Sequence, residues 1–208
     1  MDTEYFVNMI EKDLDSILNL EILKDEEFTR KLFKQKSGDK AHFYKNVIKQ
    51  SEIQPDYWGR ALMFIFRFGR YIHYHCESEF WDKVYKTANR EIVEGKLNCS
   101  LPRFVDIGFG TKIYHPYNIV INSKANLGQK CTLRHSITIG NKGDNSFPSP
   151  SIGDNVNIGL TASIFGDISI GSNSFVGGGA VVTKSFPENS KLVGNPAKNL
   201  NEAVVEKI

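Results

Sequence analysis

Aliphatic residues recur at six-residue spacing along the second half of the chain, with two interruptions. The series comprises Ile107, Ile113, Ile119, Ile121, Leu127, Leu133, Ile139, Ile152, Ile158, Ile164, Ile170, Val176 and Val182. This spacing fits neither the two-residue period of a simple strand nor the 3.6-residue period of a helix. It is typical of a parallel β-helix, in which six residues form one short strand and one turn, and three such repeats complete a coil. We therefore expect a mainly β fold with a parallel β-helix over residues 98–200.

The two interruptions of the spacing are themselves informative. A two-residue offset separates Ile119 from Ile121, and a thirteen-residue interval separates Ile139 from Ile152. The longer interval equals one repeat plus seven extra residues, which must leave the coil as a loop over residues 141–150. Loops on a rigid scaffold often carry binding and catalytic residues. This loop is therefore a candidate part of a functional site.

Residues 1–97 follow a helical pattern instead. Apolar residues over positions 6–18 recur at three- and four-residue steps after the candidate N-caps Asp2 and Thr3. A second helix is expected to begin after Pro55-Asp56. A third should run from about Ser78 to Glu94 and stop at Gly95. The sequence thus predicts an α-helical region over 1–97, the β-helix over 98–200 and a short tail over 201–208.

The segment 62–70 is both aromatic and basic, and two interpretations of it stay open. It could be a helix that packs on the end of the β-helix or on another subunit, or it could contact a membrane surface or a lipid-linked substrate. His73 and His75 follow it but do not indicate a metal site, because residues two apart on a helix point to different sides.

Composition excludes several classes of function. The net charge is +2 with a pI of about 8.3, which gives no basic footprint for nucleic acid. The three cysteines, Cys76, Cys99 and Cys131, lack metal-binding spacing and favour a reducing compartment. The acidic start Met-Asp-Thr-Glu does not resemble a signal peptide, and the apolar runs are too short for a membrane span. We expect a cytoplasmic protein, with contact at the inner face of the membrane as an alternative.

The register of the repeats brings two histidines together. His115 follows Ile113 by two residues and His135 follows Leu133 by two, and Ile113 and Leu133 are three repeats apart once the offset is counted. We expect the two imidazoles on the same face of successive coils, with their backbones about 4.8 Å apart. This pairing just before the loop favours a catalytic role for His115. His135 either shares that role or lines the acceptor site.

Four segments together resemble the left-handed β-helix acetyltransferases, and above all the serine and the capsular or exopolysaccharide O-acetyltransferases. The segments are 114–122 (YHPYNIVIN), 137–141 (ITIGN), 177–182 (GGGAVV) and 193–198 (VGNPAK). The resemblance covers about residues 100–200. It implies a left-handed coil, acetyl-CoA as the donor, and a homotrimer with its active sites at subunit interfaces.

The resemblance also implies roles for individual residues. The histidine that matches His115 is the general base of the family, and an imidazole with an ordinary pKa of about 6.5 can deprotonate a hydroxyl as it attacks a thioester. The acetyl-CoA arm is expected along the groove between adjacent subunits. Gly140, Leu160 and Gly178 are expected to contact the arm through backbone groups, and Lys184 or Lys198 is expected to pair with the phosphates of acetyl-CoA. No metal is expected.

The chain departs from the serine enzymes at three matched positions. Tyr114 replaces the aspartate before their histidine, Pro148-Ser149 replaces an arginine-histidine pair, and Ser100 aligns with the aspartate that pairs with the base. A zwitterionic amino acid needs charged partners for its ammonium and carboxylate groups. Their absence favours a sugar hydroxyl, held by neutral hydrogen bonds and by aromatic rings.

The candidate acceptor-site residues follow from these departures. The aromatic candidates are Tyr114, Tyr117 and Phe147. Without the aspartate, His115 could be oriented by Asn118, by a backbone carbonyl or by a residue of another subunit.

We therefore predict an acetyl-CoA-dependent O-acetyltransferase that modifies a sugar hydroxyl in capsular or other surface-polysaccharide synthesis. Serine O-acetylation is the alternative in the same class. A zinc carbonic anhydrase of this fold would need three histidines, and the β-helix region has two. A non-catalytic binding or scaffold protein is the alternative from another class. The expected partners are acetyl-CoA, a sugar or polysaccharide acceptor and two further copies of the chain.

Overall fold

The computed structural model describes residues 40–76, 78–143 and 148–201. The chain divides into two compact units, with the boundary between Leu97 and Asn98. The helix expected over 6–18, with its caps Asp2 and Thr3, lies outside the described residues, and so does Phe147.

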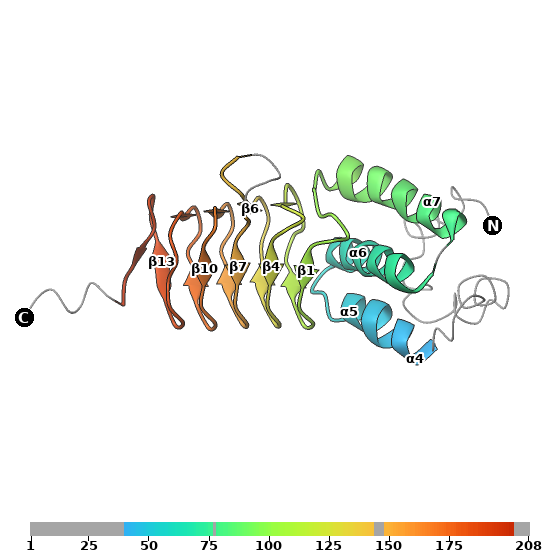
Figure 1. Cartoon of the computed structure of the whole chain (residues 1–208), viewed down its shortest axis with the longest axis horizontal. Helices are drawn as coiled ribbons and strands as arrows, with labels where there is room; N and C mark the ends of the chain where they lie inside the picture. Colours follow the sequence, from blue (N-terminus) through green and yellow to red (C-terminus); the bar gives the residue numbers. More distant parts are fainter. Residues whose placement is uncertain (1–39, 77, 144–147, 202–208) are drawn as a thin grey trace, which may run out of the picture. The chain divides into compact units, whose positions relative to one another are not determined.

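The first unit is helical (Figure 1). Its elements are α4 (Lys40–Phe43), the π-helix η1 (Tyr44–Ile48), α5 (Lys49–Glu52), α6 (Tyr57–His75), α7 (Glu79–Ala88) and the π-helix η2 (Asn89–Lys96). As predicted, α6 begins after Pro55-Asp56, because Oδ1 of Asp56 accepts a hydrogen bond from the Gly59 N–H at 2.7 Å. The third helix begins at its cap Ser78 but does not stop at Gly95. The Leu97 N–H still finds the Ile92 carbonyl across the wider π-turn, so the helix continues through the glycine.

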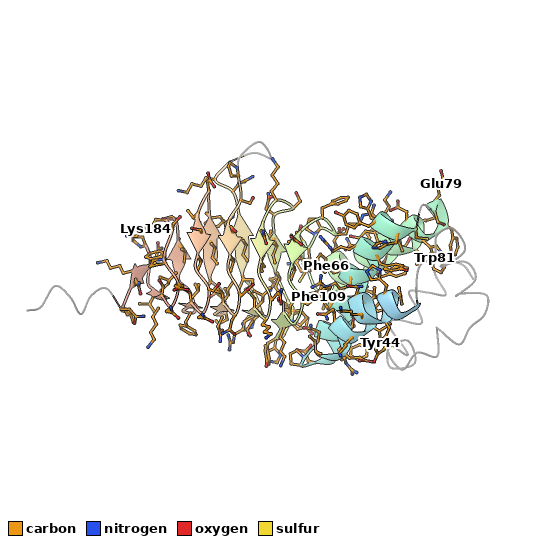
Figure 2. All side chains as sticks on the ribbon, turned by 60° about the horizontal axis from the view of Figure 1, so that its bottom comes forward. Tyr44, Phe66, Glu79, Trp81, Phe109 and Lys184 are labelled. Carbon is orange, nitrogen blue, oxygen red and sulfur yellow. The ribbon has the colours of Figure 1, made fainter. Side chains whose placement is uncertain are left out.

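Aromatic rings fill the core of the helical unit. Phe64 and Phe68 of α6 stack with their centroids 5.9 Å apart, and Phe68 meets Trp81 of α7 edge to face at 5.9 Å. Figure 2 labels Trp81 and Phe66 among these side chains. All residues over 61–69 are buried, so the apolar side chains of this segment are not available to a membrane surface. Within the described residues, no helix is both long and apolar enough to cross a bilayer.

The second unit is a parallel β-helix of short strands. The strands are β1 (Asp106–Ile107), β2 (Lys112–Ile113), β3 (Val120–Ile121), β4 (Asn126–Leu127), β5 (Thr132–Leu133), β6 (Thr138–Gly140), β7 (Ser151–Ile152), β8 (Asn157–Ile158), β9 (Ser163–Phe165), β10 (Ser169–Ile170), β11 (Phe175–Val176), β12 (Val181–Val182), β13 (Lys191–Val193) and β14 (Lys198–Asn199). They form three sheets, named here by their first strands: the β1 sheet (β1-β4-β7-β10), the β2 sheet (β2-β5-β8-β11-β13-β14) and the β3 sheet (β3-β6-β9-β12). Figure 1 shows the strands of the β1 sheet as a row of parallel arrows.

The six-residue series forms the core of the β-helix. Every residue of the series is at most 2% exposed. The pairs Ile113–Leu133, Ile121–Ile139 and Leu127–Ile152 are in register on adjacent coils. Each coil therefore stacks its aliphatic side chains on those of the next coil, which is how a solenoid buries apolar area without a globular centre.

The two-residue offset lies elsewhere than the sequence suggested. Both Ile119 and Ile121 are buried, because residues two apart on an extended segment face the same side. The Val120 N–H donates to the carbonyl of Ile137, so Ile119 matches Ile137, the residue just before β6. The two extra residues consequently lie in the turn between Ile113 and Ile119, not between Ile119 and Ile121.

The longer interruption does leave the coil as a loop. The chain departs after β6 and returns at β7, which pairs with β4 as the next regular strand of the β1 sheet (Figure 1). On the described part of the loop, Ser149 Oγ donates to Oδ1 of Asn122 at 3.0 Å, and Lys142 Nζ donates to the carbonyl of Thr183 at 3.4 Å. The ends of the loop are thus attached to neighbouring coils.

Candidate active site

The turn that joins β2 to β3 carries His115. Eight of the nine described non-glycine residues with a positive φ fall into two columns of equivalent turn positions, and His115, with a φ of 52°, is the ninth. The columns are Asn98, Asn118, Ser136 and Thr161 at this corner, and Lys130, Asn155, Asn173 and Asn189 at the corner between the β1 and β2 sheets. A left-handed conformation away from glycine costs about 1–3 kcal/mol and is enriched at functional sites. The backbone therefore distinguishes His115 from the regular turns.

Two residues from the segment before β1 support this turn. The thiol of Cys99 donates to the Pro116 carbonyl at 3.1 Å, and the Ile119 N–H donates to Cys99 Sγ at 3.4 Å. Asn98 donates from Nδ2 to Oδ1 of Asn118 at 2.8 Å. Burial raises the pKa of the Cys99 thiol, so the sulfur keeps the proton that the first bond requires. The turn is thus held on both sides of its extra residues.

The sequence pattern did not predict that Asn98 and Cys99 support the His115 turn. They precede their partners by 17 to 20 positions, and only the stacking of one coil on another makes them neighbours. Asn118, one of the expected orienting partners of His115, uses its amide oxygen for Asn98.

The two histidines share a corner but do not occupy equivalent positions. The strands before them are in the predicted register, with Ile113 opposite Leu133. Beyond the strands, the Ser136 N–H donates to the carbonyl of Tyr117 at 2.7 Å, so Tyr117 rather than His115 takes the backbone position below His135. The expected stacking is therefore wrong at the corner itself, because the two extra residues insert there and displace His115 from the ladder.

Several expected site residues form a second column at this corner, each one position before a residue with a positive φ. The Thr161 N–H donates to the His135 carbonyl at 3.1 Å, and the Gly179 N–H donates to the Leu160 carbonyl at 2.9 Å. Tyr117, His135, Leu160 and Gly178 thus follow one another from coil to coil. The Tyr117 and Leu160 side chains are about two-fifths exposed, and His115 is exposed. The corner is an open surface that a ligand can reach.

Of the remaining positions, Gly140 and Lys184 lie at or just beyond the ends of β3-sheet strands, and Lys198 lies on β14 of the β2 sheet. Gly140 ends β6, and a Cβ atom placed there would meet no heavy atom within 4 Å, so the space beside it is open. Lys184, labelled in Figure 2, follows β12 and lines a cavity of about 470 Å³. The cavity is lined by Lys142, Pro148, Gly166, Asp167, Ile168, Thr183, Lys184 and Ser185. Lys198 lies on β14, outside this cavity, so the structure separates the two lysines that the sequence left equivalent.

The positions that depart from the serine enzymes carry uncharged side chains. Ser100 pairs with Val120 in an isolated β-bridge, and Ser149 binds Asn122. Tyr114 lies against Arg134, with the guanidinium carbon 5.9 Å from the ring centroid. Among the described residues, no group of three or more His, Cys, Asp and Glu side chains is arranged to hold a metal ion.

Comparisons of the sequence place it among acetyltransferases. No family model matches it. WcaB of Escherichia coli K12, an acetyltransferase assigned to colanic acid biosynthesis, is 36% identical over 121 residues, which are 58% of this chain and 75% of WcaB. Serine acetyltransferase 4 of Arabidopsis thaliana is 36% identical over 93 residues, 44% of this chain and 26% of that protein.

Solved structures agree on the fold. Serine acetyltransferase from Neisseria gonorrhoeae superposes with a TM-score of 0.67 at 22% identity, covering 99% of this chain and 82% of that one. The soybean enzyme gives a TM-score of 0.60 at 26% identity, covering 70% and 58%. The Brucella abortus enzyme in complex with coenzyme A gives 0.59 at 22% identity, covering 93% and 70%.

Fold and relatives together define the class. The chain belongs to the hexapeptide-repeat acetyltransferases, whose catalytic domain is a left-handed parallel β-helix, as the resemblance of its motifs implied. It is an acetyltransferase.

Proposed function

We propose that this acetyltransferase transfers acetyl from acetyl-CoA to a sugar hydroxyl in the synthesis of a capsular or other surface polysaccharide, with His115 as general base. The observation that carries the proposal is the exposed histidine in a left-handed turn, flanked by Tyr114 and Tyr117. The kinship with WcaB supports a sugar acceptor.

His115 would act on the proton of the acceptor hydroxyl. As the hydroxyl oxygen attacks the thioester carbonyl, the imidazole accepts the proton, the C–O bond forms, and the C–S bond to CoA breaks. The resulting imidazolium returns the proton to the departing thiolate, so the base is regenerated in each turnover. A turn held by Cys99 and Asn98 suits this role, because a general base must be positioned within hydrogen-bond reach of the acceptor.

The donor would bind along the β3 sheet. Lys142 and Lys184 line one cavity and can pair with phosphate oxygens of CoA. The open space beside Gly140 and the exposed turn at Leu160 and Gly178 leave backbone groups accessible to its arm. The coenzyme A complex of the Brucella abortus enzyme supports this donor.

A homotrimer fits the surface chemistry of the same sheet. The strands of the β3 sheet contain no charged residue, whereas those of the β2 sheet contain Lys112, Lys191 and Lys198. Val120 of β3 is 44% exposed in the single chain. An uncharged face with an exposed aliphatic side chain favours a protein contact over solvent. Light scattering coupled to gel filtration measures the assembly directly.

The decisive assay compares acceptors. Enzyme and acetyl-CoA are incubated with L-serine or with a panel of sugars and oligosaccharides, and release of free CoA thiol is followed. We expect sugar-dependent release that His115→Ala abolishes and that His73→Ala, at an exposed histidine of α6, leaves unchanged. Release with serine alone would identify the serine enzyme that many relatives represent. Absence of acetyl-CoA binding in calorimetry would instead indicate a scaffold protein.

A further inference from the structure

Arg134 is a cation next to the candidate active site that none of the steps above uses. It follows β5 directly, precedes His135, and is half-buried. It matches Tyr114 on the coil below, since each follows one member of the pair Ile113–Leu133. Arg134 therefore lies on the outer side of the β2 sheet where the two coils that carry the histidines meet.

Neutral groups hold the guanidinium. Nη1 of Arg134 donates to Oδ1 of Asn157 at 2.6 Å, and the Tyr114 ring centroid lies 5.9 Å from the guanidinium carbon. Arg134 takes part in neither of the ion pairs found between described residues, Lys86–Asp82 and Arg90–Glu91, so no carboxylate of the described residues lies within ion-pair distance of it. A guanidinium has five N–H donors, and Asn157 accepts from Nη1 alone.

This arrangement is suited to an anion. A half-buried charge with neutral partners has lost part of its hydration without gaining a counter-charge, and an anionic ligand would supply one. The fork of an arginine binds carboxylate or phosphate oxygens in pairs, and the contacts with Asn157 and Tyr114 orient it in advance.

We propose that Arg134 binds an anionic group of the acceptor, either the carboxylate of an acidic sugar or the phosphate of an activated sugar. The inference rests on the proposed function and specifies its substrate class. Tyr114, which lies against the guanidinium, directly precedes His115 in the chain, so Arg134 lies beside the turn that carries His115. An acceptor with its hydroxyl at His115 can therefore place a charged substituent at Arg134.

Matched acceptors test the proposal. The rate constant kcat/KM is measured with glucose, glucuronic acid and glucose 1-phosphate for the unmodified enzyme, Arg134→Gln and Lys112→Gln. Glutamine can still donate to Asn157, and Lys112 is an exposed cation on the same sheet that serves as the control. We expect Arg134→Gln to lower kcat/KM about 10- to 100-fold for one of the two anionic acceptors, mainly through KM, and less than about threefold for glucose.

Comparison of glucuronic acid with glucose 1-phosphate shows whether Arg134 recognises a carboxylate or a phosphate. The measurement with glucose shows whether the Arg134→Gln variant has lost anion recognition or has a general packing defect. An equal loss with glucose and with the anionic sugars, or no preference for an anion in the unmodified enzyme, would overturn the role of Arg134 and leave the proposed function standing. Calorimetry of glucuronate and glucose 1-phosphate provides a readout without turnover. Binding that depends on Arg134 without any acetylated sugar would instead contradict the proposed function and retain the anion site.

Discussion

Two corners of the same β-helix differ in a way that separates structure from function. At the corner between the β1 and β2 sheets, the turn residues Lys130, Asn155, Asn173 and Asn189 form one unbroken column, and Asn155 donates to Asn173 at 3.0 Å. At the corner between the β2 and β3 sheets, the turn from β2 to β3 contains two extra residues and places His115 in a left-handed conformation outside the column. The regular corner is stabilised by its own repetition, whereas the irregular one needs support from Asn98 and Cys99.

The largest effect should come from removing the side chain at the irregular turn. We expect His115→Ala to lower kcat by about 10²- to 10⁴-fold, because the general base is lost. Thermal unfolding should change little, since the imidazole is exposed. The matched change at the regular corner, Asn155→Ala, should lower the melting temperature and leave kcat within about twofold. Comparable kcat values for His115→Ala and the unmodified enzyme would refute the assignment.

A second comparison concerns one buried thiol at each corner, that of Cys99 at the irregular corner and that of Cys131 at the regular one. Cys99→Ala removes the sulfur between Pro116 and Ile119, and we expect a loss of about 1–3 kcal/mol of stability together with a roughly tenfold lower kcat at unchanged KM for acetyl-CoA. Cys99→Ser should restore most of the kcat, because a hydroxyl can make both bonds.

The control is Cys131→Ala at the regular corner, where the thiol donates to the Gly153 carbonyl at 3.3 Å. This variant should lose stability without losing kcat. Equal losses of kcat in both alanine variants would show that the support of the His115 turn is not specific.

The third prediction separates the two lysines beyond the turn. Lys184→Gln should raise the KM for acetyl-CoA by about 5- to 10-fold, because the cavity that it shares with Lys142 loses a phosphate partner. Lys198→Gln, on β14, should leave KM unchanged. Initial rates over a range of acetyl-CoA concentrations test both variants. A larger increase in KM for Lys198→Gln than for Lys184→Gln would indicate that the phosphates bind at β14 instead.

The smallest effect should appear in the pH dependence of stability. Burial raises the pKa of the Cys99 and Cys131 thiols, so the folded state favours the protonated form. Their contribution is complete below the ordinary thiol pKa of about 8.5 and declines as the pH rises above it, because the unfolded chain then releases protons more readily. Urea unfolding at pH 7 and pH 10 should show a smaller decline for the Cys99→Ser and Cys131→Ser variants than for the unmodified chain.

The repeat could be predicted in detail because it is a local property. Each inward residue, such as Leu133 or Ile158, points into the coil because of its place in its own strand and turn, so spacing alone identifies it, and stacking on the neighbouring coils completes its burial. The site was predicted less completely. The motif identified His115, but the sequence placed the offset after Ile119 and took His115 and His135 as equivalent, since counting along the chain cannot show which turn absorbs two extra residues.

The sequence by itself determined the solenoid, the extruded loop and the histidine on which the proposed chemistry depends, because each follows from residues within a few positions of one another. The tertiary structure alone decided that Tyr117 lies below His135, that Cys99 and Asn98 support the turn, and that Arg134 lies between Tyr114 and Asn157. These neighbours are 17 to 23 positions apart where hydrogen bonds join them. They meet because one coil stacks on the next, and such contacts are absent from any local window of the sequence.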